Sequence, residues 1–261
     1  MSQKKKFLNI SFFIRNFNIY FQKYIIVINK LIAYALKYQG DYNQILKAIL
    51  TKEEAKEIEA NNCLTILDEG YPKEFLCLKS PPFVLFYKGN LDLLKEEKIA
   101  IVGSRKACTY ALEATKLLAL KNADKVIVSG LAKGIDAKAH TYATKTIGVI
   151  GCGIDYIYPI ENKLLYQRIE KEGLLISEYP SFCKPLSYHF PFRNRLIASL
   201  ANTVYIMQSS EKSGTITTVN EALELGKDIK VLPYDIFMEE GIYNNQLIND
   251  GALIIKKEEI V

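Results

Sequence analysis

The sequence predicts an α/β fold in which a doubly wound, mostly parallel sheet follows a small helical unit. Three observations support this prediction. Short, continuous apolar runs recur along the chain after residue 97, and such runs are typical of strands buried on both faces. The spacers between them have the length of helices, which favours parallel strands joined by helical crossovers. Before residue 60, apolar residues instead recur at intervals of three and four, as in amphipathic helices.

Residues 1–63 are predicted to hold an N-terminal extension and a small helical domain. The helical periodicity runs from Ile25 to Ala60. Thr51 and Glu54 have the spacing of a capping box, which predicts that a helix begins at Thr51.

Residues 64–97 are predicted to connect this helical domain to the sheet. Proline and glycine punctuate the segment at Tyr71-Pro72, Ser80-Pro82 and Gly89-Asn90, which indicates turns. One strand candidate lies between them, from Phe83 to Tyr87.

Residues 98–261 are predicted to form the sheet domain, with crossover helices between its strands. The expected strands are IAIVG at Ile99, VIVSG at Val126, IGVIG at Ile147, LLISEY at Leu174, TVYIM at Thr203 and IKVLP at Ile229.

The composition is that of a globular protein, and it excludes few functions. Hydrophobic residues make up 49% of the 261 positions and charged residues 24%, so a packed core is expected. The net charge of +5 is spread over 34 basic and 29 acidic side chains, and therefore does not by itself predict a polyanionic partner.

Cysteine spacing and hydropathy argue against a metal, a leader and a membrane span. The five cysteines form no CxxC pair and the two histidines are far apart, so no metal site is predicted. The apolar stretch from Phe7 to Tyr38 is interrupted by Arg15, Lys23 and Lys30, which excludes a span of about 20 residues. No signal peptide follows the basic start. A cytoplasmic protein is expected.

Polar turns at the carboxyl ends of the predicted strands indicate a phosphate-binding edge. Ligands of open parallel sheets bind at that edge. Glycine lets the backbone approach a ligand, and amides at helix N-termini favour an anion. Short turns rich in glycine and serine are also common in any α/β fold, which is the simpler interpretation. The turns concerned are Gly103-Ser104-Arg105, Ser129 to Gly134, Gly151-Cys152-Gly153 and Ser209 to Thr215.

The segment from Tyr188 to Arg195 brings two arginines and several aromatic residues together between two strands. Arginine neutralises phosphate while an aromatic face stacks a base, a combination that suits single-stranded nucleic acid. The alternative is that Phe190 and Phe192 pack in the core while Arg193 and Arg195 face water.

Fingerprints of common cofactors and of catalysis are absent. No turn matches GxGxxG or GxxxxGK[ST], so neither a dinucleotide nor a P-loop site is predicted, and no cofactor is expected. His140, Asp136 and Cys152 are interpreted as structural residues. Glu178 is expected to orient a loop amide or an arginine, since no catalytic partner is near it in the sequence. No catalytic residue is predicted.

The ordered set of motifs resembles the DNA-processing protein A (DprA/Smf) family over residues 64 to 255. The resemblance is carried by IAIVGSR, VIVSGLAKGIDAKAH, GCGIDYIYPIEN, LLISEYP, FPFRNRLIASLA, SGTITTVNEALELGK and NNQLINDGALI. It implies an extended Rossmann-like domain that binds single-stranded DNA, helps to load the RecA recombinase in natural transformation and recombination, forms homodimers and performs no catalysis. The helical domain would be of the sterile-alpha-motif type, and no winged-helix domain is expected at the C-terminal end.

Carried over by position, the resemblance predicts a DNA-binding edge. Its predicted residues are Gly103, Ser104, Arg105, Ser129, Gly130, Ala132, Lys133, Gly134, Lys163, Arg193, Asn194, Arg195, Ser213, Gly214 and Thr215. Ala111, Gln208 and Tyr234 depart from the pattern of the family.

A rival hypothesis is a nucleotide-cleaving phosphoribohydrolase of the lysine-decarboxylase-like type. SGTITTVNE faintly resembles its motif, but Ser213 precedes Gly214 and Glu221 follows Thr215 by six residues, which fits that motif poorly. For self-association, the apolar C-terminal segment with Ile229, Val231, Leu232, Ile236 and Phe237 is a candidate, although buried strand packing would produce the same pattern.

Overall fold

A computed structural model of the chain describes residues 24–260 except 57, 59, 211 and 212. Within this part, a mixed sheet of nine strands has the order β1-β2-β6-β5-β4-β3-β7-β8-β9. The predicted extension at residues 1–23 lies outside the described residues. No described helix has the length and the apolar character that crossing a bilayer requires.

The predicted strands of the sheet domain are all present, and they pair in parallel with one another. The fold class is therefore confirmed. These strands are β3 (Lys98–Gly103), β4 (Val126–Ser129), β5 (Lys145–Val149), β6 (Leu174–Ser177), β7 (Thr203–Gln208) and β8 (Asp228–Val231). A short strand that was not predicted, β9 (Leu253–Ile254), extends the sheet in parallel beside β8.

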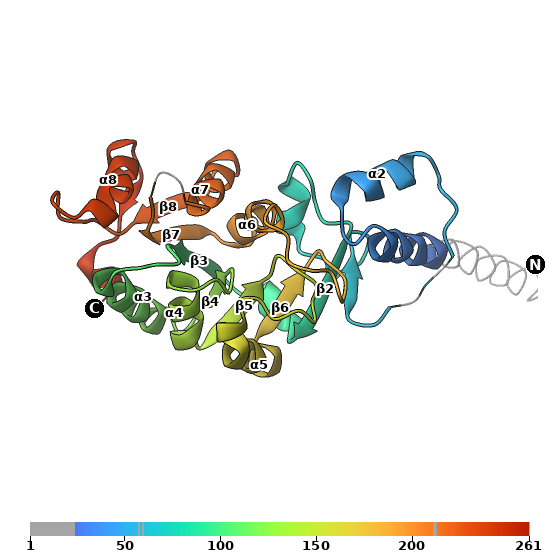
Figure 1. Cartoon of the computed structure of the whole chain (residues 1–261), viewed down its shortest axis with the longest axis horizontal. Helices are drawn as coiled ribbons and strands as arrows, with labels where there is room; N and C mark the ends of the chain where they lie inside the picture. Colours follow the sequence, from blue (N-terminus) through green and yellow to red (C-terminus); the bar gives the residue numbers. More distant parts are fainter. Residues whose placement is uncertain (1–23, 57, 59, 211–212, 261) are drawn as a thin grey trace, which may run out of the picture.

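Helices cover both faces of the sheet, as a doubly wound fold requires (Figure 1). On one face lie α3, α4 and α5, and on the other lie α6 and α7, with α8 near the C-terminal end. Their bounds are α3 (Thr109–Lys121), α4 (Ile135–Tyr142), α5 (Lys163–Glu172), α6 (His189–Leu200), α7 (Thr215–Glu224) and α8 (Ile242–Asn249). Short 3₁₀ turns are η1 (Lys73–Cys77), η2 (Leu91–Lys95), η3 (Ile160–Asn162), η4 (Glu239–Gly241) and η5 (Lys257–Glu259).

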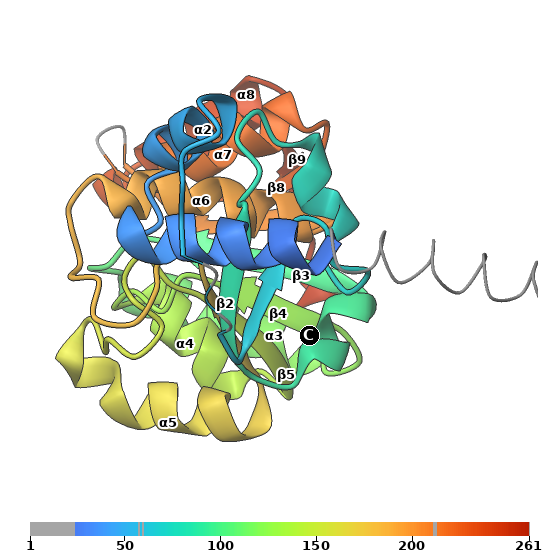
Figure 2. The same cartoon turned by 90° about the vertical axis from the view of Figure 1, so that its right-hand side faces the viewer.

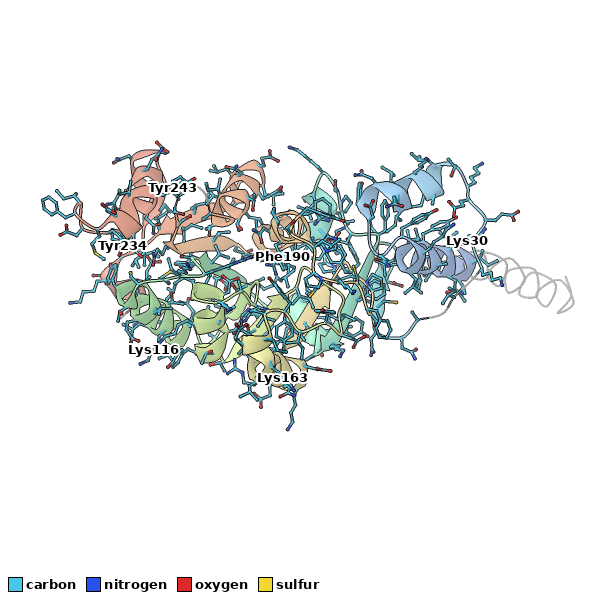
Figure 3. The ribbon with its side chains drawn as sticks, viewed as in Figure 1. Lys30, Lys116, Lys163, Phe190, Tyr234 and Tyr243 are labelled. Atoms are coloured by element: carbon cyan, nitrogen blue, oxygen red, sulfur yellow. The ribbon has the colours of Figure 1, made fainter. Side chains whose placement is uncertain are left out.

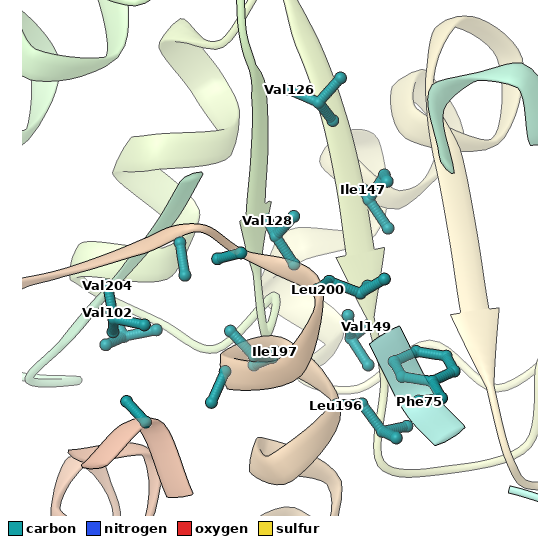
Figure 4. Packing of buried hydrophobic residues seen from close by; sticks show 14 of the residues in the cluster. Phe75, Val102, Val126, Val128, Ile147, Val149, Leu196, Ile197, Leu200 and Val204 are labelled. Atoms are coloured by element: carbon teal, nitrogen blue, oxygen red, sulfur yellow. The ribbon is translucent and has the colours of Figure 1, made fainter. Parts of the chain in front are cut away.

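The largest hydrophobic cluster lies between the sheet and α6. Val102, Val128 and Val149 from neighbouring strands pack against Ile197 and Leu200 of α6 (Figure 4). Each of these side chains is at most 4% exposed. Burial on both faces explains why the strands are continuous apolar runs in the sequence.

The predicted connector belongs to the sheet. Its strands β1 (Cys63–Thr65) and β2 (Val84–Gly89) pair antiparallel with each other, and β2 pairs antiparallel with β6, where Phe86 lies opposite Ser177. The strands on both sides of the predicted boundary at residue 97 therefore belong to one sheet. The domain limits stay a prediction.

The N-terminal helices end before the predicted capping box. Residues 24–37 are helical, and α2 (Tyr42–Leu50) follows, with the side chain of Asp41 accepting a hydrogen bond from Gln44 N at 2.9 Å. The prediction that a helix begins at Thr51 is wrong, because Thr51 is the C-cap of α2 and its hydroxyl donates to Lys47 O at 2.9 Å. Lys52 then adopts φ +52, which ends the helix.

The two N-terminal helices pack at the antiparallel end of the sheet, and Figure 2 shows the helix of residues 24–37 crossing in front of β2, with α2 above it. Leu31 and Ile32 join one cluster with Val84 and Phe86 of β2. The ring of Tyr42 stacks on Phe83, with centroids 5.0 Å apart. This stacking joins α2 to the residue that precedes β2.

Candidate functional site

A hollow of about 620 Å³ lies at the carboxyl edge of the parallel strands, between the turns after β3 and β4 and the starts of α6 and α7. We call it the groove. It brings together much of the predicted site. The predicted residues that line it are Gly103, Ser104, Arg105, Ala132, Arg193, Asn194, Ser213, Gly214 and Thr215.

Two exposed cations and a pair of aromatic rings border the groove. Arg105 and Lys106 are both exposed, and the Arg105 guanidinium lies 5.6 Å from the centroid of the Phe190 ring. The Phe190 and Tyr158 rings lie 5.3 Å apart. Phe190 rests over Gly151, where an added Cβ would come within 3.0 Å of the ring (Figure 3 labels Phe190). Positive charge and aromatic surface therefore meet at one side of the groove.

The turn that carries Arg105 is held by backbone contacts. Ser104 N donates to Gln208 O at 2.8 Å, and Ser104 O accepts from Ile135 N at 3.2 Å. Gly134 has φ +73, and a Cβ there would lie 2.3 Å from Ser104 O. Only glycine fits this close approach between two turns. The side-chain oxygen of Gln208 also accepts from Cys108 N at 2.8 Å, so an amide supplies the acceptor at this departure from the family pattern.

The opposite wall of the groove is the start of α7. The Asn194 amide donates to Gly214 O at 3.0 Å and to Thr217 Oγ1 at 2.9 Å. Ser213 Oγ accepts from Thr215 N at 3.2 Å. A Cβ at Gly214 would meet nothing within 4 Å, so this backbone faces open space. Asn194 therefore positions the helix start whose hydroxyls and amides line the groove.

Arg193 lines the groove but directs its donors at the backbone. Its side chain is 4% exposed, and Nη1 donates to Gly130 O at 2.9 Å and to Val149 O. Asp136, from the other face of the sheet, accepts from Gly130 N at 3.1 Å and from Ala132 N at 3.4 Å. Burial raises the pKa of Asp136, and the nearby Arg193 opposes that rise. The pair joins α4 and α6 across the ends of β4 and β5.

Gly130 is a glycine because it lies between these two charged groups. A Cβ at this position would lie 2.5 Å from Arg193 Nη2 and 2.8 Å from Asp136 Oδ2. Gly130 therefore contributes backbone geometry and leaves room for the side chains of Arg193 and Asp136.

Arg195 does not line the groove. It is 4% exposed, and its guanidinium pairs with Glu178, with Nη1 2.6 Å from Oε2. It also donates to Ser80 O at 2.9 Å and lies 3.7 Å from the centroid of the Phe192 ring. Residues two apart on a helix point about 200° away from each other, so Arg193 and Arg195 cannot face the same side. The expectation that Glu178 orients an arginine matches this contact.

The remaining predicted residues lie around the groove without lining it. Ser129 is buried and its hydroxyl donates to Ile101 O at 2.6 Å. Lys133 is exposed, pairs with Glu161, and lines a neighbouring shallow hollow that also contains Tyr158. Lys163 is exposed at the start of α5 and lines neither hollow; Figure 3 shows it projecting away from the body of the molecule.

The prediction omitted Lys106 and Tyr158, and it left the role of Phe190 open. Lys106 follows Arg105 in the same exposed turn, so its position gave a usable signal. Tyr158 comes from the loop after β5, and only the fold brings it to Phe190.

Groups that resemble catalytic residues are structural here. His140 is fully buried and hydrogen-bonds Thr146 Oγ1 through Nδ1 at 2.6 Å, and burial lowers its pKa to about 3. Burial raises the pKa of Cys152 to about 12. Glu221 does not line the groove, where Asp136 is the one carboxylate among the described residues. The described part of the chain also contains no cluster of three potential metal ligands.

The model of the DNA recombination-mediator protein A family matches residues 62–261. The chain belongs to this family. The resemblance inferred from the motifs is thereby confirmed. The family is described as a recombination mediator and one solved relative as a single-stranded DNA binder, which agrees with the prediction that the chain is not an enzyme.

Named relatives of the family match most of the chain. DNA processing protein DprA of Streptococcus pneumoniae is 42% identical over 209 residues, which cover 77% of this chain and 73% of that protein. DNA processing protein DprA of Bacillus subtilis is 40% identical over 205 residues, covering 76% of this chain and 69% of its own length.

Two solved structures from the family share the fold. DNA processing protein A of Streptococcus pneumoniae aligns with a TM-score of 0.74 and 34% identity, over 94% of this chain and 96% of that one. The protein from Helicobacter pylori, whose structure is described as revealing a single-stranded DNA binding mode, aligns with a TM-score of 0.68 and 36% identity, over 74% of this chain and 90% of that one.

Proposed function

We propose that this protein binds single-stranded DNA in the groove, protects incoming DNA, and helps to load the RecA recombinase during natural transformation and recombination in the cytoplasm. The observation that carries the proposal is the meeting of exposed Arg105 and Lys106 with the ring pair Phe190 and Tyr158 at the carboxyl edge of the sheet. The single-stranded DNA binding described for the Helicobacter pylori relative supports it.

The charged side of the groove suits phosphate. Arg105 and Lys106 extend from a turn that backbone contacts hold in place, and among the described residues of the opposite wall there is no exposed carboxylate that would compete for them. Opposite them, Ser213 and Gly214 offer a hydroxyl and open backbone at a helix start. Guanidinium and ammonium groups neutralise backbone phosphates without reading sequence, so binding to many sequences is expected.

The aromatic rings beside these cations suit an unpaired base. Phe190 packs on Gly151 and against Tyr158, so its ring is supported while remaining half-buried. A base can stack on such a ring only when its face is free, as in a single strand. In a duplex the base faces are covered by their neighbours, so the groove should prefer single-stranded DNA.

Self-association belongs to the same proposal. Of the apolar C-terminal residues, Ile229, Val231 and Leu232 are buried in the core, whereas Ile236 is 81% and Phe237 87% exposed. Large exposed apolar side chains are typical of interaction surfaces. We propose that a homodimer forms at this end of the sheet, and that loading of RecA follows once the dimer holds the strand.

The test is a titration of labelled oligo-dT and of a matched duplex with the wild-type chain and with the Arg105→Ala/Lys106→Ala variant. At about 50 mM and about 200 mM salt, affinity for the single strand should fall steeply, because each neutralised phosphate contributes about −0.7 to the logarithmic slope. The double variant should bind more weakly and with a shallower slope.

Lys171→Ala is the matched control, since Lys171 is exposed on α5, was not predicted to bind DNA and lines neither hollow. It should bind as the wild type does. Equal binding by the double variant and the control would place the site elsewhere, and an affinity independent of salt would contradict phosphate contacts. Release of free base from nucleoside monophosphates would instead support the nucleotide-cleaving alternative.

A further inference from the structure

A second hollow, of about 500 Å³, lies where the N-terminal helical unit meets the segment after β6. We call it the aromatic hollow. One wall is the turn between the helix of residues 24–37 and α2, and the other is the chain from Tyr179 to Phe192. Its rings come from Tyr38, Tyr42, Tyr179, Tyr188, His189 and Phe192.

Two of the rings that line the hollow have a neighbour packed on one face. Tyr42 stacks on Phe83 with an interplanar angle of 13°. Phe192 carries the Arg195 guanidinium 3.7 Å from its centroid. Both rings are half-buried and line the hollow, so their remaining exposed surface is available for stacking.

His189 supplies an unpartnered acceptor in the same wall. Its side chain is 5% exposed, and Nδ1 has no hydrogen-bond partner. Burial lowers the pKa of His189, and the Gly151 backbone hydrogen-bonds the imidazole, so the ring is neutral and Nδ1 is its bare acceptor. Tyr179 stacks on one face of the imidazole at 3.9 Å, and Tyr188 packs edge-on at 4.6 Å. A buried acceptor of this kind is rare without a ligand or water.

The polar groups of the aromatic hollow suit a base better than a phosphate. Lys37 is paired with Glu53 at 2.6 Å, so its charge is already balanced. Asp41 adds a carboxylate, which repels an anion, and Asn43 and Gln44 add exposed amides. Amide groups and a neutral acceptor match the donor and acceptor edge of a heterocyclic base.

The aromatic hollow adjoins the groove through one segment. The groove is lined by Phe190 and Pro191, and the aromatic hollow by their neighbours His189 and Phe192. The two sites therefore lie on opposite sides of the same stretch of chain, at the start of α6.

We propose that the aromatic hollow binds one nucleobase, which stacks on its rings and donates an N–H to His189 Nδ1. The base belongs either to a free nucleoside or to a strand held in the groove, and only the second source rests on the proposed function. The ring of Tyr188, which is 63% exposed and lies edge-on to the imidazole, turns onto the bound base and supplies stacking surface.

The first experiment is equilibrium dialysis of adenosine, guanosine, cytidine and thymidine against the wild-type chain and its variants. Tyr188→Ala should weaken nucleoside binding about tenfold through the lost stacking surface. His189→Phe keeps a ring and removes the acceptor, so it should weaken binding while circular dichroism shows an intact fold. Phe182→Ala is the control, since Phe182 is 88% exposed in the same loop and lines neither hollow.

The second experiment tests the strand as the source of the base. Oligo-dT carrying 5-iododeoxyuridine is irradiated with the wild-type chain, and the cross-linked tyrosine is identified by mass spectrometry. A cross-link to Tyr42 or Tyr188 supports a base from the strand, and nucleoside binding that Tyr188→Ala weakens supports the free nucleoside.

Arg105→Ala separates the two proposals. Nucleoside binding retained in Arg105→Ala while oligo-dT binding is weakened supports both sites. If Arg105→Ala binds oligo-dT as tightly as the wild type does, the proposal that DNA binds in the groove is contradicted. The nucleoside result at the aromatic hollow is not affected by that outcome. Two outcomes would overturn the proposal that the aromatic hollow binds a nucleobase. The first is that the wild type shows neither nucleoside binding nor a cross-link. The second is that nucleoside binding is lost in Arg105→Ala and kept in Tyr188→Ala.

Discussion

Two groups of polar side chains meet near the carboxyl edge of the sheet, and they differ in what their charges contact. The exposed group at the groove has Arg105 and Lys106 beside the Phe190 ring. The buried group behind it has Arg193 on the backbone of β4 and β5 and Arg195 on Glu178. The arginine of the first group is therefore exposed and free of a carboxylate partner among the described residues of the groove, whereas the arginines of the second group hold the structure together.

The difference follows from solvation. A buried charge must have a partner, because removal from water is costly, and Arg195 and Glu178 are both about 95% buried. An exposed charge such as Arg105 remains hydrated until a ligand replaces the water. The buried group also places the exposed one, since Arg193 and Asp136 hold together the turns that border the groove. Substitutions in the two groups should therefore separate stability from DNA binding.

The largest effect is expected for Arg195→Ala. It leaves Glu178 buried without its cation, which should lower the free energy of unfolding by about 3–5 kcal/mol. Urea unfolding measures this change. Lys79→Ala is the control, because the Lys79–Glu224 pair is exposed and should contribute less than about 1 kcal/mol. Similar losses in both variants would contradict the distinction between buried and exposed charges.

A pH dependence should come from His140, which lies in the buried region and whose pKa is about 3 in the folded chain. The ordinary value is about 6.5, so below that pH the unfolded chain takes up a proton that the folded chain does not. The contribution of neutral His140 to the free energy of unfolding is therefore fully present above about pH 6.5. It is lost as pH falls toward 3, by about 1.4 kcal/mol per pH unit.

Urea unfolding at pH 7.5, 5.5 and 4.5, values chosen to span about two units below the ordinary pKa, measures this slope. In His140→Gln the slope should be smaller, while the lowered pKa of His189 leaves part of it in place. An unchanged slope in the variant would show that other groups cause the acid sensitivity.

The smallest of the three effects is expected in the exposed group. Phe190→Ala should weaken binding of oligo-dT by about 1–3 kcal/mol, because it removes a surface on which a base stacks. Phe190→Tyr keeps the ring and should bind nearly as the wild type does, as measured by fluorescence anisotropy. Phe182→Ala serves as the exposed aromatic control. Equal affinity for Phe190→Ala and the control would remove Phe190 from the binding surface.

The parallel strands and their polar turns could be predicted from the sequence because their signals are local. A strand buried on both faces is apolar throughout, as β3 and β4 are. The carboxyl ends of parallel strands meet at one edge, so Ser104 and Ala132 were correctly expected near each other. The prediction of a helix start at Thr51 was wrong because its two-residue pattern is also compatible with a helix end. In the structure Thr51 is the C-cap of α2.

The fold class, the family and the turns that form the groove could all be derived from local sequence patterns. Those patterns could not distinguish Arg193 and Arg195 from Arg105, because burial depends on which distant groups surround a side chain. Glu178 and Ser80, which hold Arg195, come from separate parts of the chain. The aromatic hollow likewise exists only after the N-terminal helices pack beside the segment after β6. Tertiary packing decides these features because desolvation and hydrogen bonding depend on distances in space, whereas strand and helix patterns depend on neighbours in the chain.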